Sequence, residues 1–426
     1  MLKERIQYLC DKKQMSRKEL TDGLVTQAHF SNILAGRYPL PDDLAEAIAQ
    51  RLGVETEYIA QTDNTEQPIL EQAERILNML TAQASSITEQ SVNELPDRHP
   101  ALTIELTTAL MKATYYQQFN DQDAYHYLHQ SYLNIYLEQF GRPDTLHLPA
   151  PLQQALLFYK IQNFRALGQY YDVLHQLDIW LPLLEQGSEL WLTAQHIRVE
   201  AYIHTRQLEQ AKHSFEKITL HIYEQRMFYR LSGLYVLYSG YCYSMEWTQE
   251  ALTALAMAEA HLVHAQHQSD MLSTIMNNRI VILTRSGELS QAEQELVRFR
   301  SMVQMQPEDI QQQWEPMLLI YDCEIAWSRK EWSKLVNLLD RLRAYMLTTD
   351  QQMALLFYES QLSLSMGENE SFVEQALQCL PYFEQMRQQD RLGVLYEGLA
   401  TGAEEQRRYK DAALYYRKLV YLLRHA

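Results

Sequence analysis

Residues Trp247 to Glu259 read WTQEALTALAMAE, and Tyr409 to Leu419 read YKDAALYYRKL. Each stretch opens with a large aromatic residue and carries an alanine three or four positions later. An alanine at that place lets two helices cross closely, and this combination is typical of the helix pairs of tetratricopeptide repeats. Both stretches therefore predict the second helix of a repeated helix pair.

The same signal recurs through most of the chain, at steps of 37 to 43 residues. These steps exceed the usual tetratricopeptide period of about 34 residues, so we interpret the copies as lengthened repeats. Glycine is sparse, with 13 in 426 residues, and from residue 101 onward nothing shows the alternation of a β-strand. The residues that open the second helices are Tyr170, Leu208, Trp247, Leu289, Trp332, Phe372 and Tyr409.

We therefore predict an all-α fold whose main part, residues 101–426, consists of about eight helix pairs. Such pairs bury their apolar sides only against their neighbours, so the stack should curl into an α-solenoid with a concave face. An irregular helical bundle is the alternative for the same residues.

Upstream of the repeats, residues 15–52 read MSRKELTDGLVTQAHFSNILAGRYPLPDDLAEAIAQRL. Leu20 and Leu24 lie four apart, which places them on one face of a short first helix. Thr26 is suited to cap a second helix, and Gly36 is suited to end that helix in a left-handed conformation. The arrangement predicts a helix-turn-helix DNA-binding unit.

The outer side of this second helix is polar, because Phe30 and Ile33 occupy its inner side. Glutamine and asparagine match the donor and acceptor of adenine in the major groove, and alanine suits the thymine methyl group. Serine and basic residues suit phosphate oxygens. A small amphipathic helical subdomain without DNA is the alternative. The candidate DNA-binding residues are Gln27, Ala28, Ser31, Asn32, Arg37, Arg17 and Lys18.

Residues 1–60 resemble the DNA-binding domain of the peptide-sensing regulators grouped as Rap–Rgg–NprR–PlcR–PrgX. Their pattern, a hydrophobic residue followed by S-x-I-x-x-G, is matched from Phe30 to Gly36. Leu34 departs from it, because an acidic residue is common at that position. Lambdoid phage repressors share this type of helix-turn-helix, and that resemblance implies base contacts at Gln27, Ala28 and Asn32.

The tandem helix pairs extend the resemblance over nearly the whole chain, whose length is nearest to the long NprR-like members. The resemblance implies that a short linear signalling peptide, secreted and re-imported, binds along the concave face and alters DNA binding by a homodimer. Asparagines on first helices hold the peptide backbone in that family, and Asn277 and Asn278 match them best. Other first-helix candidates for the peptide groove are Gln195, Arg198, Tyr202, Tyr238, Tyr241, Tyr321 and Glu324.

Charge is distributed unevenly along the chain. The net charge of −17 argues against a protein that coats nucleic acid generally. Residues 1–37, however, carry seven basic and four acidic side chains. Few phosphate contacts favour site-specific binding of a double-stranded DNA operator by a dimer on two half-sites. The acidic remainder suggests a ligand with at least one cationic group.

The chain shows no sign of export or of a membrane segment. Its four cysteines, at positions 10, 242, 323 and 379, form no C-x-x-C motif and indicate reduced thiols. The start MLKERIQYL lacks a secretory apolar region, and the uncharged stretch 231–245 is shorter than a membrane span. We therefore expect a cytoplasmic protein without membrane contact.

The polar, proline-containing residues 61–68 predict a linker, and residues 69–83 predict a connecting helix. The next stretch, 85–100, looks loop-like. The predicted domains are 1–60, which binds DNA; 61–100, a linker with its connecting helix; and 101–426, the repeat-built sensor.

Nothing in the sequence predicts a cofactor or an enzyme. Phosphate-binding loops, metalloprotease motifs and nucleophile elbows are absent. His261, His264 and His267 recur every three residues on an expected helix, but no further ligand accompanies them, which favours a solvated or capping role over a metal site.

Three alternatives to a peptide-responsive regulator remain open. The repeats of long family members resemble phosphorelay inhibitors, so this domain is a candidate to sequester a response-regulator protein. A second alternative is a repressor whose repeats only oligomerise or act as a protein-interaction scaffold. A third, a catalytic helical domain, is disfavoured by the missing motifs.

Overall fold

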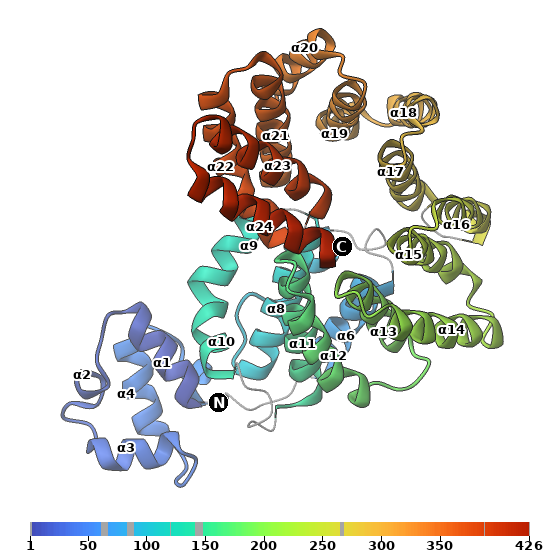
Figure 1. The fold of residues 1–426 in the computed structure, drawn as a ribbon. Coiled ribbons are helices and arrows are strands. Elements are labelled where there is room, and N and C mark those ends of the chain that lie inside the picture. The colour runs from blue at the N-terminus through green and yellow to red at the C-terminus, as the bar shows by residue number, and fades with distance from the viewer. Residues whose placement is uncertain are drawn as a thin grey trace. The chain divides into compact units, whose positions relative to one another are not determined.

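The computed structural model describes residues 2–60, 67–82, 89–119, 121–140, 148–264, 268–386 and 388–425. In these ranges every regular element is a helix, which confirms the predicted all-α fold (Figure 1). None of the described helices combines the length and the apolar character that crossing a membrane requires. Two compact units divide the chain, the first made of residues 1–166 and 170–201, the second of residues 167–169 and 202–426.

The first unit begins with five short helices around a small apolar core, in which Ile6, Leu20 and Ile48 are fully buried. The hydroxyl of Ser16 caps the second helix by accepting a hydrogen bond from the N–H of Glu19. In return, the N–H of Ser16 donates to the carboxylate of Glu19 at 2.7 Å. This capping box explains why so short a helix forms here. The five helices are α1 (Leu2–Lys12), α2 (Arg17–Thr21), α3 (Gln27–Leu34), α4 (Asp42–Leu52) and α5 (Thr56–Ala60).

The remainder of the first unit contains the connecting helix and the first helix pairs. The connecting helix α6 buries Ala73, Ile76, Leu77 and Leu80, the side predicted to be apolar. The second helix of the first pair is interrupted by a π-helical segment, η2 (His129–Leu133). The helices are α6 (Gln67–Ala82), α7 (Glu89–Asn93), α8 (Leu102–Gln118), α9 (Gln122–Leu128), α10 (Asn134–Phe140), α11 (Ala150–Ala166), α12 (Tyr170–Trp180) and α13 (Glu189–His204).

Two local predictions for this unit are wrong. Leu24 does not share a helix face with Leu20, because α2 ends at Thr21 and Gly23 reverses the chain at φ +68°, which leaves Leu24 38% exposed. The stretch 85–100 is not entirely loop, because Val92 is buried and anchors the short helix α7 against α8. Of the predicted linker, residues 61–66 lie outside the described part of the chain.

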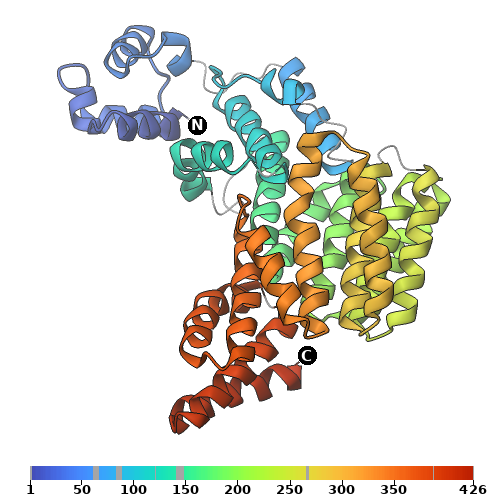
Figure 2. The same cartoon turned by 90° about the horizontal axis from the view of Figure 1, so that it is seen from above.

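The second unit stacks consecutive helices side by side, as Figure 2 shows for the helices between residues 230 and 330. The alanines predicted at close helix crossings are buried, with Ala211, Ala251 and Ala292 fully so and Ala412 at 4% exposure. The helices are α14 (Leu208–Glu224), α15 (Leu231–Ser244), α16 (Thr248–Ala260), α17 (Gln268–Arg285), α18 (Leu289–Gln304), α19 (Glu308–Ser328), α20 (Trp332–Leu342), α21 (Thr349–Met366), α22 (Asn369–Met386), α23 (Gln389–Glu405) and α24 (Tyr409–His425).

The predicted starts of the second helices are close to the observed ones, with one exception. Phe372 does not open α22, which begins three residues earlier at Asn369, directly after the left-handed turn at Gly367. Phe372 is instead 1% exposed within the helix. The turn therefore sets the helix start, and the large side chain only fills the core behind it.

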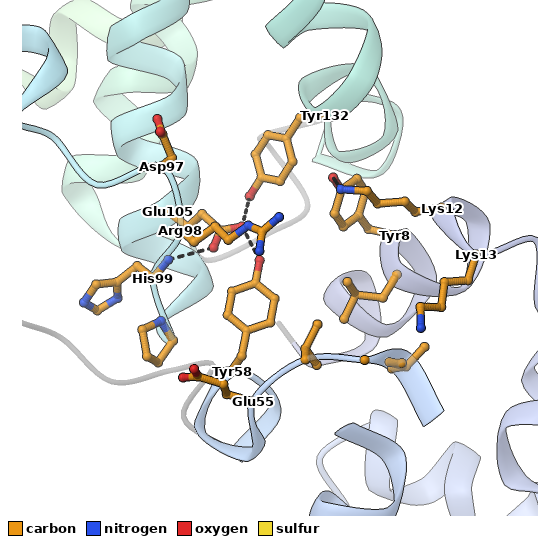
Figure 3. Close-up of a pocket in the computed structure, with 15 residues that line it drawn as sticks. Tyr8, Lys12, Lys13, Glu55, Tyr58, Asp97, Arg98, His99, Glu105 and Tyr132 are labelled. Atoms are coloured by element: carbon orange, nitrogen blue, oxygen red, sulfur yellow. Dashed lines mark hydrogen bonds between the residues drawn. The ribbon is translucent and has the colours of Figure 1, made fainter. Parts of the chain in front are cut away.

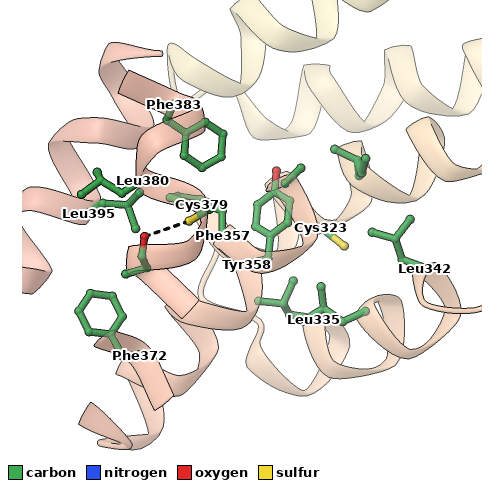
Figure 4. Packing of buried hydrophobic residues seen from close by; sticks show 14 of the residues in the cluster. Cys323, Leu335, Leu342, Phe357, Tyr358, Phe372, Cys379, Leu380, Phe383 and Leu395 are labelled. Carbon is green, nitrogen blue, oxygen red and sulfur yellow. Dashed lines mark hydrogen bonds between the residues drawn. The ribbon is translucent and has the colours of Figure 1, made fainter. Parts of the chain in front are cut away.

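The core of the last helix pairs is continuous from α19 to α23 (Figure 4). Phe357 of α21 and two phenylalanines of α22, Phe372 and Phe383, are buried in it, and Cys323 and Cys379 belong to the same core. All four cysteines of the chain are buried and free, and burial raises the pKa of the Cys379 thiol to about 11. These thiols therefore behave as small apolar core groups.

Candidate functional site

The outer face of α3 is open to solvent. Gln27, Ala28 and Ser31 are exposed, whereas Phe30 and Ile33 on the opposite side are each 3% exposed. The side chains that would meet a DNA groove are therefore not part of the protein core, as the sequence predicts for a recognition helix.

The backbone around α3 is held in place by its neighbours. The hydroxyl of Thr26 accepts a hydrogen bond from the N–H of His29 at 3.3 Å, which confirms the predicted N-cap. From α4, the guanidinium of Arg51 donates to the carbonyl oxygens of Leu20 at 2.8 Å and Glu19 at 3.2 Å. A cation at these carbonyls satisfies the end of α2 and ties it to α4.

The other predicted DNA contacts are partly engaged within the protein. The guanidinium of Arg37 donates to Oδ1 of Asn32 at 3.0 Å, and Arg17 donates to the side-chain oxygen of Gln7 at 2.5 Å. Lys18 is exposed. Because its oxygen already accepts from Arg37, Asn32 presents chiefly its N–H donors outward, and reading adenine through both groups would require Arg37 to move.

A cavity of about 830 Å³ opens where α1 and α5 meet α8 and η2 (Figure 3). Its lining includes Tyr8, Tyr58, Glu105 and Tyr132, and the last three are joined by hydrogen bonds. This volume lies within the usual range of ligand pockets.

The second unit contains a groove of about 470 Å³ formed by first helices of successive pairs. Its apolar wall contains Ile280, Met317, Ile320, Trp327 and Val394. Polar side chains stand between them, so the groove offers both apolar contact and hydrogen bonds, the combination that a short extended chain requires. The polar lining is Tyr243, Asn277, Thr284, Arg285, Tyr321, Glu324, Ser328, Asp350, Tyr358, Gln388, Asp390 and Arg391.

Asn277 lies in this groove with part of its hydrogen-bonding capacity unused. Its amide donates to Oδ1 of Asn278 at 3.0 Å, and its own Oδ1 accepts from the hydroxyl of Tyr321. A primary amide has two N–H donors and two lone pairs on its oxygen. Among the described residues one donor and one acceptor of Asn277 therefore remain, which is what one peptide group of an extended ligand needs.

Two charged pairs belong to the lining of the groove. Arg285 contacts Asp390 at 2.9 Å, and Arg391 contacts Glu324 at 3.6 Å. Glu324 also accepts from the hydroxyl of Tyr358, whose pKa burial raises well above its usual range. These side chains can exchange partners with a ligand because most of them are partly exposed.

Solved structures show the same architecture. A Rap protein complexed with competence and sporulation factor is 16% identical, matches 84% of this chain and 98% of its own length, and has a TM-score of 0.61. Aspartyl phosphate phosphatase F from Bacillus subtilis is 13% identical, matches 84% and 94%, and has a TM-score of 0.50. This chain has the Rap fold.

At such identities the Rap fold is all that these two structures establish. PlcR of Bacillus thuringiensis, in complex with a peptide and DNA, is 14% identical over 64% of this chain and 95% of its own, with a TM-score of 0.35, too low to support an argument. No protein-family model matches the sequence, and no curated protein sequence matches it.

Within the Rap fold, four of the predicted peptide contacts fall outside the groove of the second unit. Asn278 supports Asn277 rather than lining the groove. Tyr238 stacks on Phe215 at 4.5 Å and, at 5.7 Å, on Tyr241, which is 7% exposed. Tyr202 is half-buried on α13 and does not line the groove.

Two further candidates belong to the first unit. Gln195 is buried on α13, and Arg198 pairs with Asp178 at 3.2 Å. The groove thus contains Asn277, Tyr321 and Glu324 from the predicted set. The sequence reasoning missed its charged residues Arg285, Asp390 and Arg391, although position on a first helix was a usable signal for them.

The predicted histidine array is not a regular α-helical one. His261 and His264 lie on a short 3-10 helix, where His261 stacks on Tyr235 at 5.4 Å, and His267 lies outside the described residues. Burial, together with the neighbouring His264, lowers the pKa of His261. Among the described residues no three potential ligands gather around a metal position.

Proposed function

We propose that this chain is a DNA-binding transcription regulator that responds to a short linear peptide. The observation that carries the DNA-binding part is the exposed outer face of α3, with Gln27, Ala28 and Ser31 free to meet base edges. The capped and braced α2–α3 turn supports this role, because a recognition helix must be presented rigidly.

The peptide part rests on the groove of the second unit. Asn277 offers one donor and one acceptor at the groove wall. Asp350 adds a carboxylate that, among the described residues, accepts one hydrogen bond, from the hydroxyl of Tyr382. A peptide with a cationic group and apolar side chains fits this lining. The solved Rap protein bound to competence and sporulation factor is consistent with such a ligand.

The proposed mechanism is a shift between conformations of the repeat stack. A peptide stabilises the curvature to which it binds best, and a homodimer then presents its two recognition helices at a changed spacing. Binding a palindromic operator requires both helices at once, so a small change of placement alters affinity strongly.

Genomic-fragment capture by the purified chain, with and without short peptides from the producing culture, tests both parts. We expect a few palindromic sites to be enriched and their enrichment to change with peptide. The double variant Q27A/N32A should fold normally and lose this preference. Enrichment indifferent to peptide would leave a DNA-binding protein with a scaffold domain, and operator preference retained by the double variant would overturn the assignment of the α3 face.

A second candidate function is supported by the extent of the fold match, which covers almost the full length of both Rap proteins. One of them is named an aspartyl phosphate phosphatase, so the repeat stack is a candidate to bind a response regulator that carries such a group. Purified chain mixed with a phosphorylated response regulator distinguishes the outcomes. A stable complex that is lost on adding peptide supports sequestration, and faster loss of the acyl phosphate supports an enzyme. If the mixture shows no complex and no faster loss of the acyl phosphate, this candidate function is excluded.

A further inference from the structure

An ion pair buried in the first unit joins the start of the chain to α8. Arg5 of α1 is fully buried and Glu105 of α8 is 1% exposed, with 3.3 Å between their side chains. One hundred residues separate them in the sequence. Because a buried charge is tolerated only with full compensation, the surroundings of this pair indicate what the structure must preserve.

The carboxylate of Glu105 is surrounded by donors from three further segments. The hydroxyl of Tyr58 donates to Oε1 at 2.7 Å and that of Tyr132 donates to the same oxygen at 2.6 Å. The backbone N–H of His99 donates to Oε2 at 2.8 Å. With Arg5, four donors converge on one carboxylate. Figure 3 shows the three donors from Tyr58, His99 and Tyr132.

The two terminal nitrogens of Arg5 are matched in the same way, whereas its Nε meets no hydrogen-bond partner among the described residues. Its guanidinium donates to the carbonyl oxygens of Tyr58 at 2.9 Å, of His99 at 2.8 Å and of Pro100. Its planar group also lies 4.0 Å from the centre of the Tyr58 ring. Because the guanidinium of Arg5 is planar and meets several fixed acceptors, its contacts set the orientation of the neighbouring helices as well as their distance. Helices α1 and α5 are therefore held at one angle to α8.

The π-helical segment η2 brings the last donor into place. Tyr132 lies in η2, its ring meets that of Tyr8 edge-on at 5.1 Å, and its hydroxyl reaches Glu105. An extra residue in one helical turn changes which side chain faces inward, and such insertions often occur at functional positions. The α9–α10 helix is thus locally altered at the point where it meets the N-terminal helices.

Beside this cluster the packing is open. The 830 Å³ cavity separates the end of α1, at Lys12 and Lys13, from the loop that carries Asp97 and Arg98. The junction therefore depends on the polar cluster and on the Tyr8 contacts more than on a continuous apolar interface. Meanwhile Gln27 of α3 remains exposed, so the docked arrangement orients the recognition helix and does not mask it.

We propose that Arg5 and Glu105 are positioning residues, which fix the angle at which the helix-turn-helix helices are held against the first helix pair. Through this angle they select the spacing of the two half-sites that a dimer reads. The inference about spacing rests on the proposed DNA-binding function, whereas the fixed angle does not.

The angle is measured directly with spin labels at two exposed positions of the first unit, Q50C on α4 and Q122C on α9, in the full chain. The native cysteines are buried, so the introduced thiols take the labels. We expect one narrow distance distribution in the parent protein and a broadened one in E105Q. As the matched control, E200Q neutralises the acid that pairs with Arg165 elsewhere in the unit, where the two side chains are 22% and 30% exposed, and it should leave the distribution narrow.

The second readout is affinity for a palindromic operator whose half-sites are moved apart by five base pairs. The parent protein should lose at least tenfold in affinity, whereas E105Q should lose less than threefold and bind a single half-site within twofold of the parent. A parent that binds no DNA sequence would refute the proposed function, and the label distances would still decide the fixed angle.

A folded E105Q with a distribution as narrow as that of the parent overturns the proposal, and so does unchanged spacing discrimination. Should E105Q fail to fold, Y132F carries the test, because it removes one hydroxyl from Glu105 and keeps the ring that packs on Tyr8. A narrow distribution in folded Y132F would then count against the fixed angle, and a broadened one would support it.

Discussion

The junction within the first unit and the groove of the second unit both contain arginine–carboxylate pairs, but the two pairs have different roles. At the junction Arg5 and Glu105 are almost completely buried, and the two terminal nitrogens of Arg5 and both carboxylate oxygens of Glu105 meet fixed partners. In the groove Arg285 and Asp390 are 37% and 61% exposed. A buried pair cannot lose one member cheaply, whereas an exposed pair can exchange its partner for water or ligand. Burial therefore separates a structural joint from a surface ready to bind.

The largest expected effect comes from breaking the buried pair on one side. R5M leaves the Glu105 carboxylate without its cation and should lower the free energy of unfolding by about 3–5 kcal/mol. Urea denaturation followed by circular dichroism measures the loss. A reduction below about 1 kcal/mol would mean that water reaches Glu105, and the contrast with the groove would fail.

The next effect concerns ligand binding. N277A removes the amide that keeps one donor and one acceptor free, so peptide affinity should fall about tenfold, equal to about 1.4 kcal/mol, with apo DNA binding spared. Calorimetry with the active peptide measures it. N278A is the comparison, because Asn278 only supports Asn277 and should cost less. Equal losses in both variants would return Asn278 to the groove, and no loss in either would remove both from the site.

Local sequence patterns predicted the repeat architecture well, because alanines at helix crossings must be small and large residues must fill the core beside them. They missed how the turns are made. Each of the seven turns from the α11–α12 pair to the α23–α24 pair has a left-handed residue two positions before the second helix. Glycine takes this position in three turns, so glycine alone would not reveal the period. The seven residues are Gly168, Arg206, Glu246, Gly287, Lys330, Gly367 and Arg407.

The site was predictable only in part, for a physical reason. Helical periodicity indicates which side chains leave a helix on one face, so the exposed face of α3 followed from the spacing of Phe30 and Ile33. Which distant residues meet is a property of the packed stack. The Arg5–Glu105 pair joins segments one hundred residues apart, and no local pattern announces it. Leu34 is a smaller case, because it is buried at a position where an acidic residue is common in the domains that residues 1–60 resemble.

Acidification should act on a second, partly buried charge cluster of the repeats. The hydrogen bond from Arg298, aided by Arg279 and opposed by burial, lowers the pKa of Glu259. Its folded pKa lies below its unfolded value, so its stabilising contribution is complete above the ordinary glutamate pKa and is lost as the pH falls through the folded value. E259Q should therefore lose less free energy of unfolding on acidification than the parent protein, by a difference of less than about 1 kcal/mol. Thermal unfolding between pH 6 and pH 3 measures this, with E250Q, at an exposed position of the same helix, as control. Parallel curves for E259Q and the parent would contradict it.

The smallest effect is expected at the exposed Arg285–Asp390 pair of the groove. D390N removes the charge that faces Arg285, and because both side chains are well exposed the free energy of unfolding should change by less than about 0.5 kcal/mol. Peptide affinity should nevertheless respond, since Arg285 would then be free for an acidic group of a ligand and the groove would attract cationic groups less. Denaturation and calorimetry on the same variant compare the two quantities. A stability loss near that of R5M would show that the groove pair is structural, and the distinction between a fixed joint and an exchangeable surface would no longer hold.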